Sequence, residues 1–335
     1  MFMCTFGAAL IVVAVVVAGN FLLRRRIVSS DGKAVLITGC DRGFGYMLAV
    51  QLSKLGYRVF AACYDATGEG ATKLRETSSF IVVVQLDVTS DKQVEEARRF
   101  VESELDGDGL WAVVNNAGIG AFAEAEWCSL SAYQTVMNVN WMGTVRVTKS
   151  FLPLVRTTRG RIINIASLAG RIALPGFTAY SSTKFAVVGF SDSLRREMFK
   201  FGVKVITIEP SLYKTAISNE EALTRQNAKM WGETSQEVRH EYGDTYFRAY
   251  LAKLATILRY SSEKIHEVVD DLTHAVTSSH PYTRYVPALF TNQLPSDGFA
   301  ASPNHFQDFV LGTIFKVPET PACLSAERLD EQKAL

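Results

Sequence analysis

Short apolar runs alternate with longer amphipathic stretches through most of the chain. The short runs, such as AVLIT and FIVVVQLDV, are rich in β-branched residues and predict buried strands, whereas stretches such as GYMLAVQLSKLG predict helices. Buried strands that alternate with helices indicate an α/β fold, a doubly wound parallel sheet of the Rossmann type. Strands are expected at 34–38, 58–63, 80–88, 111–118, 160–167 and 203–210, and helices at 45–56, at 91–105, at about 131–155 with an end near Pro153, and at about 179–200.

The pattern changes after Pro210. Residues 211–260 have helical propensity and many aromatic and charged side chains, which predicts a helical lid packed over one edge of the sheet. One more helix and a last short strand are expected before residue 287. We therefore expect a main domain over 33–290 and a tail over 291–335 that contains the short apolar segment FVLGTIF.

The N-terminus carries a long run without charge. Residues 2–23 are almost all apolar, and three arginines, Arg24, Arg25 and Arg26, follow them. About 20 apolar residues at about 1.5 Å rise would cross a hydrocarbon core of about 30 Å. Residues 1–26 are therefore expected to be a transmembrane anchor with its basic flank, and the positive-inside bias places the following domain in the cytosol.

Composition excludes several classes of protein. Hydrophobic residues make up 48% of the chain, so a sizeable core is expected, and the net charge of +1 gives no reason to expect a nucleic-acid partner. The five cysteines are widely scattered, and the five histidines all lie in the last third of the chain. Neither set has the spacing of a disulfide framework or of a metal site, so no metal is expected.

A glycine-rich turn, TGCDRGFG at residues 38–45, lies directly between the first strand and the first helix. In such a turn Gly39 would permit the tight bend, Gly43 would let the backbone approach a pyrophosphate, and Gly45 would allow close helix packing. A plain tight turn is the alternative. The motif NNAG (115–118) ends the fourth expected strand and favours a ligand, because ligands bind at the carboxyl ends of parallel strands.

Candidate chemistry lies in the stretch AYSSTKF. Tyr180 and Lys184 are four residues apart, so a helix places them on one face. A free tyrosine has a pKa of about 10, and a neighbouring ammonium lowers that pKa because it favours the phenolate. The pair is either a tuned acid/base or a surface helix pair, since this spacing alone occurs often.

Together, TGCDRGFG, NNAG and YSSTK stand in the order and spacing of the short-chain dehydrogenase/reductase family, which the chain resembles over most of residues 33–215. The resemblance implies that Tyr180 is the general acid/base and that Lys184 lowers the pKa of Tyr180 and binds the nicotinamide ribose. It also implies that Ser167, in NIAS, holds the reacting oxygen, and that Asn140, in NVNWMG, supports a water-linked proton relay.

The same resemblance implies a nicotinamide dinucleotide cofactor. Asp87 would contact the adenine, Asn115 and Gly118 would line the nucleotide, and Thr215 would hold the carboxamide. One departure is Ser211, where the family usually has glycine after the proline. The residues expected at the cofactor are Thr38, Gly39, Asp41, Arg42, Gly43, Phe44, Gly45, Asp87, Asn115, Gly118, Tyr180, Lys184, Pro210 and Thr215.

The choice between NAD and NADP depends on the end of the second strand. An acidic residue there binds the ribose hydroxyls of NAD, whereas an arginine accommodates the 2′-phosphate of NADP. Cys63 occupies the usual discriminating position and is neither, Asp65 follows it, and Arg42 lies in the glycine-rich turn. The resemblance favours NAD, with NADP as the alternative.

Longer segments narrow the substrate class. GLWAVVNNAG, FGVKVITIEP and SSHPYTRYVP are similar to the branch that holds retinol dehydrogenases and 3α- and 17β-hydroxysteroid dehydrogenases. This similarity implies a lipophilic alcohol or carbonyl substrate, a location in the endoplasmic reticulum membrane, and a possible homodimer.

Two alternatives stay open. A hydroxybutyrate dehydrogenase of the same branch shares KMWGETSQEVRHEYGDTYF; a substrate carboxylate would need a buried cation in the lid, such as Lys214, Arg225 or Lys229. A non-catalytic nucleotide-binding scaffold is the second alternative, and the intact catalytic-type residues argue against it.

Overall fold

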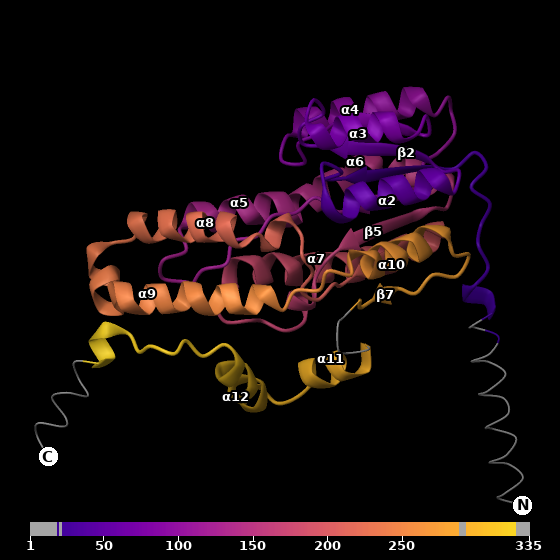
Figure 1. Ribbon diagram of the computed structural model, residues 1–335. Coiled ribbons are helices and arrows are strands. Elements are labelled where there is room, and N and C mark those ends of the chain that lie inside the picture. Colours follow the sequence, from indigo (N-terminus) through magenta and orange to yellow (C-terminus); the bar gives the residue numbers. More distant parts are fainter. Residues whose placement is uncertain (1–18, 20–21, 288–292, 326–335) are drawn as a thin grey trace, which may run out of the picture.

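The computed structural model describes residues 19, 22–287 and 293–325. Its centre is a sheet of seven strands in the order β3-β2-β1-β4-β5-β6-β7, and every neighbouring pair is parallel (Figure 1). The doubly wound sheet predicted from the sequence is confirmed. The strands are β1 (Ala34–Thr38), β2 (Arg58–Cys63), β3 (Ile81–Gln85), β4 (Ala112–Asn115), β5 (Arg161–Ile165), β6 (Lys204–Ile208) and β7 (Arg284–Tyr285).

Helices cover both faces of the sheet. On one face α2 (Gly43–Lys54), α3 (Glu69–Thr77) and α10 (Ile265–Thr277) share a core with alternate strand residues, and on the other α4 (Asp91–Glu104), α6 (Thr144–Thr157) and α7 (Thr178–Met198) do the same. The sequence pattern did not predict α3. Only Ala71 and Leu74 of this helix are buried, so its apolar stripe is too short to stand out.

The long helix expected at about 131–155 differs from the prediction in two ways. It consists of α5 (Leu130–Met137), a π-helical turn (Asn138–Gly143) and α6, and it runs past Pro153 to Thr157. A proline inside a helix removes one backbone hydrogen bond and usually ends the helix. Here Phe151 and Val155 are fully buried on either side of Pro153, and this packing keeps the chain helical.

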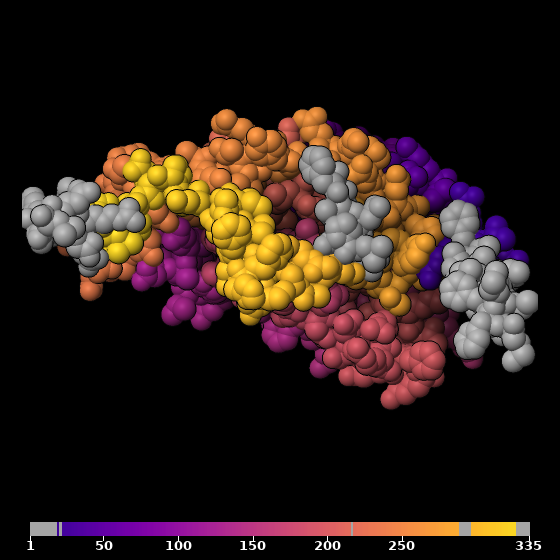
Figure 2. All heavy atoms as spheres, turned by 90° about the horizontal axis from the view of Figure 1, so that it is seen from below, coloured from indigo at the N-terminus to yellow at the C-terminus, as the bar shows by residue number. Residues whose placement is uncertain are grey.

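The predicted lid region contains α8 (Glu220–Glu233) and α9 (Gln236–Arg259), and α9 bends at Gly243. Both helices pack around Trp127 in an aromatic cluster. Two further helices, α11 (Gln293–Ala300) and α12 (Asn304–Ile314), lie below them (Figure 1). Figure 2 shows the C-terminal segment, in yellow, crossing this lower face beside the orange helices.

The predicted membrane anchor lies outside the described residues, apart from Gly19 and residues 22–26. Within the described ranges, no helix is long and apolar enough to cross a membrane. Residues 24–28 are bonded to the end of α10 and to the segment that follows it. The Val28 amide donates to the Thr277 carbonyl at 2.8 Å, the Ser279 amide donates to the Arg26 carbonyl at 2.8 Å, and the Arg24 guanidinium lies 3.8 Å from the Tyr282 ring centroid.

Candidate active site

A cavity of about 1910 Å³ opens at the carboxyl ends of the strands. Residues at or directly after the ends of β1 to β6 line it, and this is the edge of a doubly wound sheet at which ligands bind. The structure therefore brings most of the expected site residues together. Those that line the cavity are Gly39, Asp41, Arg42, Gly43, Phe44, Asp87, Gly118, Ser167, Tyr180, Lys184, Pro210 and Thr215.

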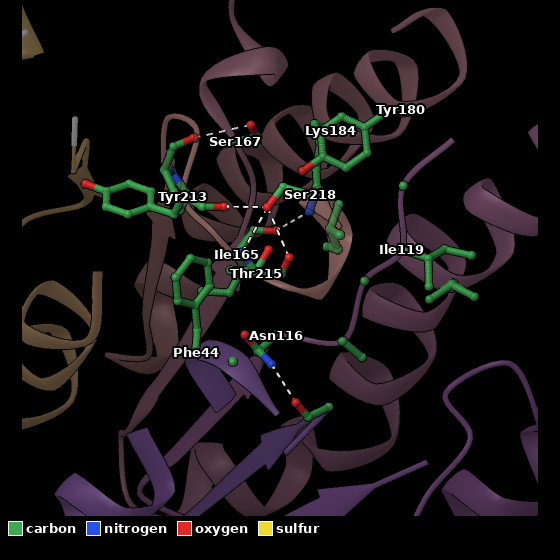
Figure 3. Close-up of a pocket in the computed structure, with 18 of the residues that line it drawn as sticks. Phe44, Asn116, Ile119, Ile165, Ser167, Tyr180, Lys184, Tyr213, Thr215 and Ser218 are labelled. Atoms are coloured by element: carbon green, nitrogen blue, oxygen red, sulfur yellow. Dashed lines mark hydrogen bonds between the residues drawn. The ribbon is translucent and has the colours of Figure 1, made fainter. Parts of the chain in front are cut away.

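The glycine-rich turn packs tightly against the turn that follows β4. A Cβ atom on Gly45 would lie 2.5 Å from Asn116 Nδ2 and 2.6 Å from the Gly39 carbonyl oxygen. Asn116 Nδ2 donates to the carbonyls of Thr38 at 2.8 Å and Gly39 at 3.0 Å. Figure 3 draws one of these bonds as a dashed line from Asn116. The residue before α2, Arg42, makes no side-chain cap, so the first amides of α2 have no such partner at the cavity. This cradle fits the pyrophosphate of a dinucleotide.

Two expected cofactor residues have other contacts. The Asn115 side chain is buried in the sheet and donates to Thr148 Oγ1 at 2.9 Å and Asn164 Oδ1 at 2.8 Å. Asn115 was expected to line the nucleotide, but it is not among the residues that line the cavity. Thr38 Oγ1 accepts the amides of Asn116 and Ala117, each at 3.0 Å. Thr38 thus holds the turn after β4 in place, whereas Asn115 ties β4 to α6 and β5. Alternation along β4 explains the difference, because Asn115 still belongs to the strand and Asn116 is the first residue after it.

Tyr180 and Lys184 lie next to each other on α7 (Figure 3). Lys184 Nζ is 5.5 Å from the centroid of the Tyr180 ring and donates to the Ile165 carbonyl at 2.9 Å. Ser167 Oγ donates to the Pro210 carbonyl at 3.3 Å and accepts the Ala169 amide at 3.1 Å. The three side chains come from α7 and from the loop after β5, and all face the cavity.

The pKa values within the protein differ from the expectation. Burial raises the pKa of Tyr180 to about 12, and interaction with the Ser167 hydroxyl opposes this rise only in part. Burial lowers the pKa of Lys184 to about 8. The expected lowering of the Tyr180 pKa by Lys184 is not found in the protein chain alone, because the ammonium lies beside the ring and bonds to a backbone carbonyl. At neutral pH the phenol is therefore protonated.

Asn140 does not line the cavity but bonds to two segments that form it. It lies in the π-helical turn and is buried, and its amide clamps Ile119: Oδ1 accepts the Ile119 amide at 2.8 Å and Nδ2 donates to the Ile119 carbonyl at 2.9 Å. Nδ2 also donates to Thr183 Oγ1 at 3.0 Å. Asn140 thus fixes the loop after Gly118 to α7, and its predicted part in a proton relay stays a prediction.

The region expected to bind the adenosine ribose lies between β1 and β2. Asp41 accepts the backbone amides of Tyr64 at 3.0 Å and Asp65 at 2.9 Å, so its carboxylate shapes the loop after β2. Asp65 lines the cavity together with two cations, Arg42 and Lys73. Hydrogen bonds from Thr67 keep the pKa of Asp65 below its usual range. Two cations, Arg42 and Lys73, and the fixed carboxylate of Asp65 thus lie at the same end of the cavity. The choice between NAD and NADP remains a prediction.

The opposite end of the cavity is apolar. Pro210, Tyr213 and Thr215 form one side of the middle section, where Ser218 Oγ bonds to the backbone of Tyr213 and Thr215. Beyond them the walls come from the loop after β4, the segment before α7, the turn at residues 216–218, α8, the end of α9, α11 and α12. Sequence reasoning named none of these wall residues individually, because they come from segments far apart in the chain: Ile119, Phe122, Leu174, Phe177, Ile217, Leu223, Leu258, Phe299, Val310, Leu311 and Ile314.

The fold and this site define a dinucleotide-dependent dehydrogenase or reductase, and comparison with known proteins agrees. The family described as short chain dehydrogenase matches residues 33–226, more than half of the chain. The chain belongs to the short-chain dehydrogenase/reductase family, and it is an NAD(P)-dependent oxidoreductase.

Curated relatives include several different enzymes. Mouse short-chain dehydrogenase/reductase family 9C member 7 is 42% identical over 288 residues, which cover 85% of this chain and 91% of the relative. Mouse retinol dehydrogenase 7 is 43% identical and covers 79% of this chain and 84% of its own. Rat mitochondrial D-beta-hydroxybutyrate dehydrogenase is also 43% identical, over 77% of this chain and 78% of its own. The sequence identities do not distinguish a retinol dehydrogenase from a hydroxybutyrate dehydrogenase, since both relatives are 43% identical.

Solved structures share the fold at lower identity. A Burkholderia cenocepacia short chain dehydrogenase in complex with NADP has a TM-score of 0.62 at 22% identity and covers 85% of this chain and 99% of its own. A Burkholderia phymatum short chain dehydrogenase/reductase in complex with NAD has a TM-score of 0.63 at 23% identity, over 77% of this chain and 90% of its own. These likenesses support the architecture of the nucleotide-binding sheet.

Proposed function

We propose that the protein is a membrane-anchored dehydrogenase that transfers a hydride between NAD or NADP and a lipophilic secondary or allylic alcohol or its carbonyl, a retinoid or a hydroxysteroid. The observation that carries this proposal is the apolar end of the cavity. Among the described residues, the cations that line the cavity are Arg42 and Lys73 at the nucleotide end and Lys184 beside Tyr180. The walls beyond Tyr180 are mainly aliphatic and aromatic, which suits an apolar substrate.

A small hydroxy acid is the second candidate, supported by the relative that acts on hydroxybutyrate. Its carboxylate would need a cation in the lid. The three candidates are paired elsewhere: Lys214 with Glu263 at 2.5 Å, Arg225 with Glu221 at 3.9 Å and Lys229 with Glu233 at 3.8 Å. All three are at least half exposed, and none lines the cavity. These contacts favour the lipophilic substrate.

The residues suggest how the reaction proceeds. The bound cofactor supplies or takes the hydride. Tyr180 exchanges the proton of the substrate hydroxyl, and its raised pKa keeps it protonated at neutral pH, as donation to a carbonyl requires. Ser167 orients the substrate oxygen. Lys184 lies close enough to Tyr180 for its ammonium to stabilise the phenolate that forms when the proton leaves.

Membrane attachment rests on the charge-free run of residues 2–23. The backbone bonds of Arg26 and Val28 at the end of α10 would couple such an anchor rigidly to the catalytic domain. A lipophilic substrate partitions into the bilayer, so an anchored cavity would meet it at a high local concentration. The endoplasmic reticulum location depends on the resemblance to the retinol and hydroxysteroid dehydrogenases, whereas the cytosolic placement of this domain depends on the three arginines after the apolar run and on the positive-inside bias.

Substrate panels test the proposal. The full-length protein in detergent is incubated with NAD or NADP and with all-trans retinol, a 3α-hydroxysteroid or 3-hydroxybutyrate, and the absorbance of the reduced nicotinamide is followed. We expect turnover of retinol or the steroid. Tyr180→Phe should lower kcat by about 10²- to 10⁴-fold while NADH still binds, whereas Tyr57→Phe, which loses a hydroxyl bonded to the Val28 carbonyl, should leave kcat unchanged. Turnover of 3-hydroxybutyrate alone would overturn the proposal.

A further inference from the structure

A buried carboxylate joins three elements behind the active site. Glu209 stands between β6 and Pro210, and its side chain is 0% exposed. Its Oε1 accepts from Arg171 Nη2 at 2.9 Å and from Thr207 Oγ1 at 3.0 Å, and its Oε2 accepts from Arg284 Nε at 2.7 Å. A buried carboxylate with this many donors is held in a single position.

The two arginines lead to opposite sides of the cavity. Arg171 directly follows the short helical turn Leu168–Gly170, which Ser167 begins. Arg284 lies in β7 and also pairs with Asp297 on α11. Two residues of the same helix, Ser296 and Phe299, lie one and two positions from Asp297 in the sequence, and both line the cavity. A continuous chain of ion pairs therefore connects the turn that carries Ser167 with the helix that walls the substrate end.

The charges in this chain balance, since two guanidinium groups face two carboxylates. Exposure rises outward: the side chains of Glu209, Arg284 and Asp297 are 0%, 15% and 41% exposed. Each inner pair thus has one fully buried partner, Glu209, whereas the outer pair has none and is the weakest link. Separation of Asp297 from Arg284 would release α11 without disturbing Glu209.

We propose that Glu209 and Arg284 are positioning residues that couple the Ser167 turn to α11, and that the Arg284–Asp297 ion pair holds α11 as the wall of the substrate end. The proposal takes its choice of substrate from the proposed function. The coupling itself depends only on the contacts above, and so it can be tested without a substrate.

The outer pair is tested first. Asp297→Asn keeps the shape of the side chain and removes its charge. Hydrogen exchange of the α11 amides should become faster, and KM for the lipophilic alcohol should rise about two- to fivefold with kcat unchanged. Asp297→Glu should restore both values. Glu102→Gln is the matched control, because it removes one carboxylate from an exposed ion pair with Arg98 on α4.

The inner carboxylate is tested with Glu209→Gln. The amide has one acceptor oxygen where the carboxylate has two, so one of the two arginines loses its bond to residue 209. Exchange at residues 168–172 should become faster, and kcat should fall by about tenfold or more. If this variant does not fold, Asp297→Asn still decides. Exchange of α11 in Asp297→Asn that matches Glu102→Gln would overturn the proposal. If the wild type turns over no lipophilic alcohol, the proposed function fails while the exchange result stands.

Discussion

Gly45→Ala tests whether the glycine-rich turn must touch the turn after β4. Gly45 is the third residue of α2, where alanine is normally the better helix former. Here the added methyl would lie 2.5 Å from Asn116 Nδ2 and 2.6 Å from the Gly39 carbonyl oxygen, both well inside van der Waals contact. Asn116 would have to move and give up its bonds to the Thr38 and Gly39 carbonyls.

The size of the effect follows from these contacts. Two hydrogen bonds are worth about 1 kcal/mol each, and the better helix propensity of alanine returns about 1 kcal/mol. The shifts of neighbouring atoms that are needed to remove the overlap cost about a further 1 to 2 kcal/mol. The net cost is then about 2 to 3 kcal/mol, and it falls on the cradle, so NADH binding should weaken about 30- to 150-fold.

The assay is a fluorescence titration of NADH, together with thermal unfolding of the same samples. Gly189→Ala serves as the control, since a Cβ there would have nothing within 4 Å. Gly189 lies in α7, and its replacement by alanine should stabilise the fold by about 1 kcal/mol. NADH affinity of Gly45→Ala equal to that of Gly189→Ala would refute the close-contact reasoning.

Three further predictions concern the buried polar groups. Asn115→Ala should lower the free energy of unfolding by about 2 to 3 kcal/mol, because Asn164 Oδ1 loses its donor, and urea unfolding measures this while KM for NAD stays level. Lys184→Met should raise KM for the cofactor and lower kcat, seen in steady-state kinetics, since the ammonium that favours the Tyr180 phenolate is lost. The oxidation rate should rise with pH up to about pH 8, because only the phenolate accepts a proton and burial raises the pKa of Tyr180 to about 12; above about pH 8 the rise should flatten and the reduction rate should fall, because the Lys184 ammonium, whose pKa burial lowers to about 8, loses its proton.

Local signals explain why the sheet could be predicted. Most strands of the centre are short apolar runs buried on both faces, as β1 and β4 are, and such runs can be recognised in the sequence without knowledge of the fold. Helix α3 escaped because it buries only two side chains, and the end of α6 was misplaced because packing of Phe151 outweighs the effect of Pro153. Burial, which decides such cases, is a property of the folded chain.

The candidate site divides in the same way. Residues in motifs could be named from the sequence, since a motif places them near a strand end. The roles assigned to them remain predictions. Contacts between separate elements could not be foreseen: Asp41 bonds to the loop at Tyr64, and Arg284 of β7 bonds to Asp297 on α11. The difference between Asn115 and Asn116 depends on where β4 ends, which a motif does not specify within one residue.

The lid cations show why composition misleads about a substrate. Helix α8 turns Ala222, Leu223 and Gln226 toward the cavity, whereas Glu221 and Arg225 lie on its other side and pair with each other. A cation in the sequence of an amphipathic helix therefore belongs by default to its solvent face. A hydroxy acid bound beyond Tyr180 would leave its carboxylate among apolar side chains, where an unpaired charge costs several kcal/mol. A lipophilic alcohol would instead gain about 25 cal/mol for each Å² of apolar surface that the same walls remove from water.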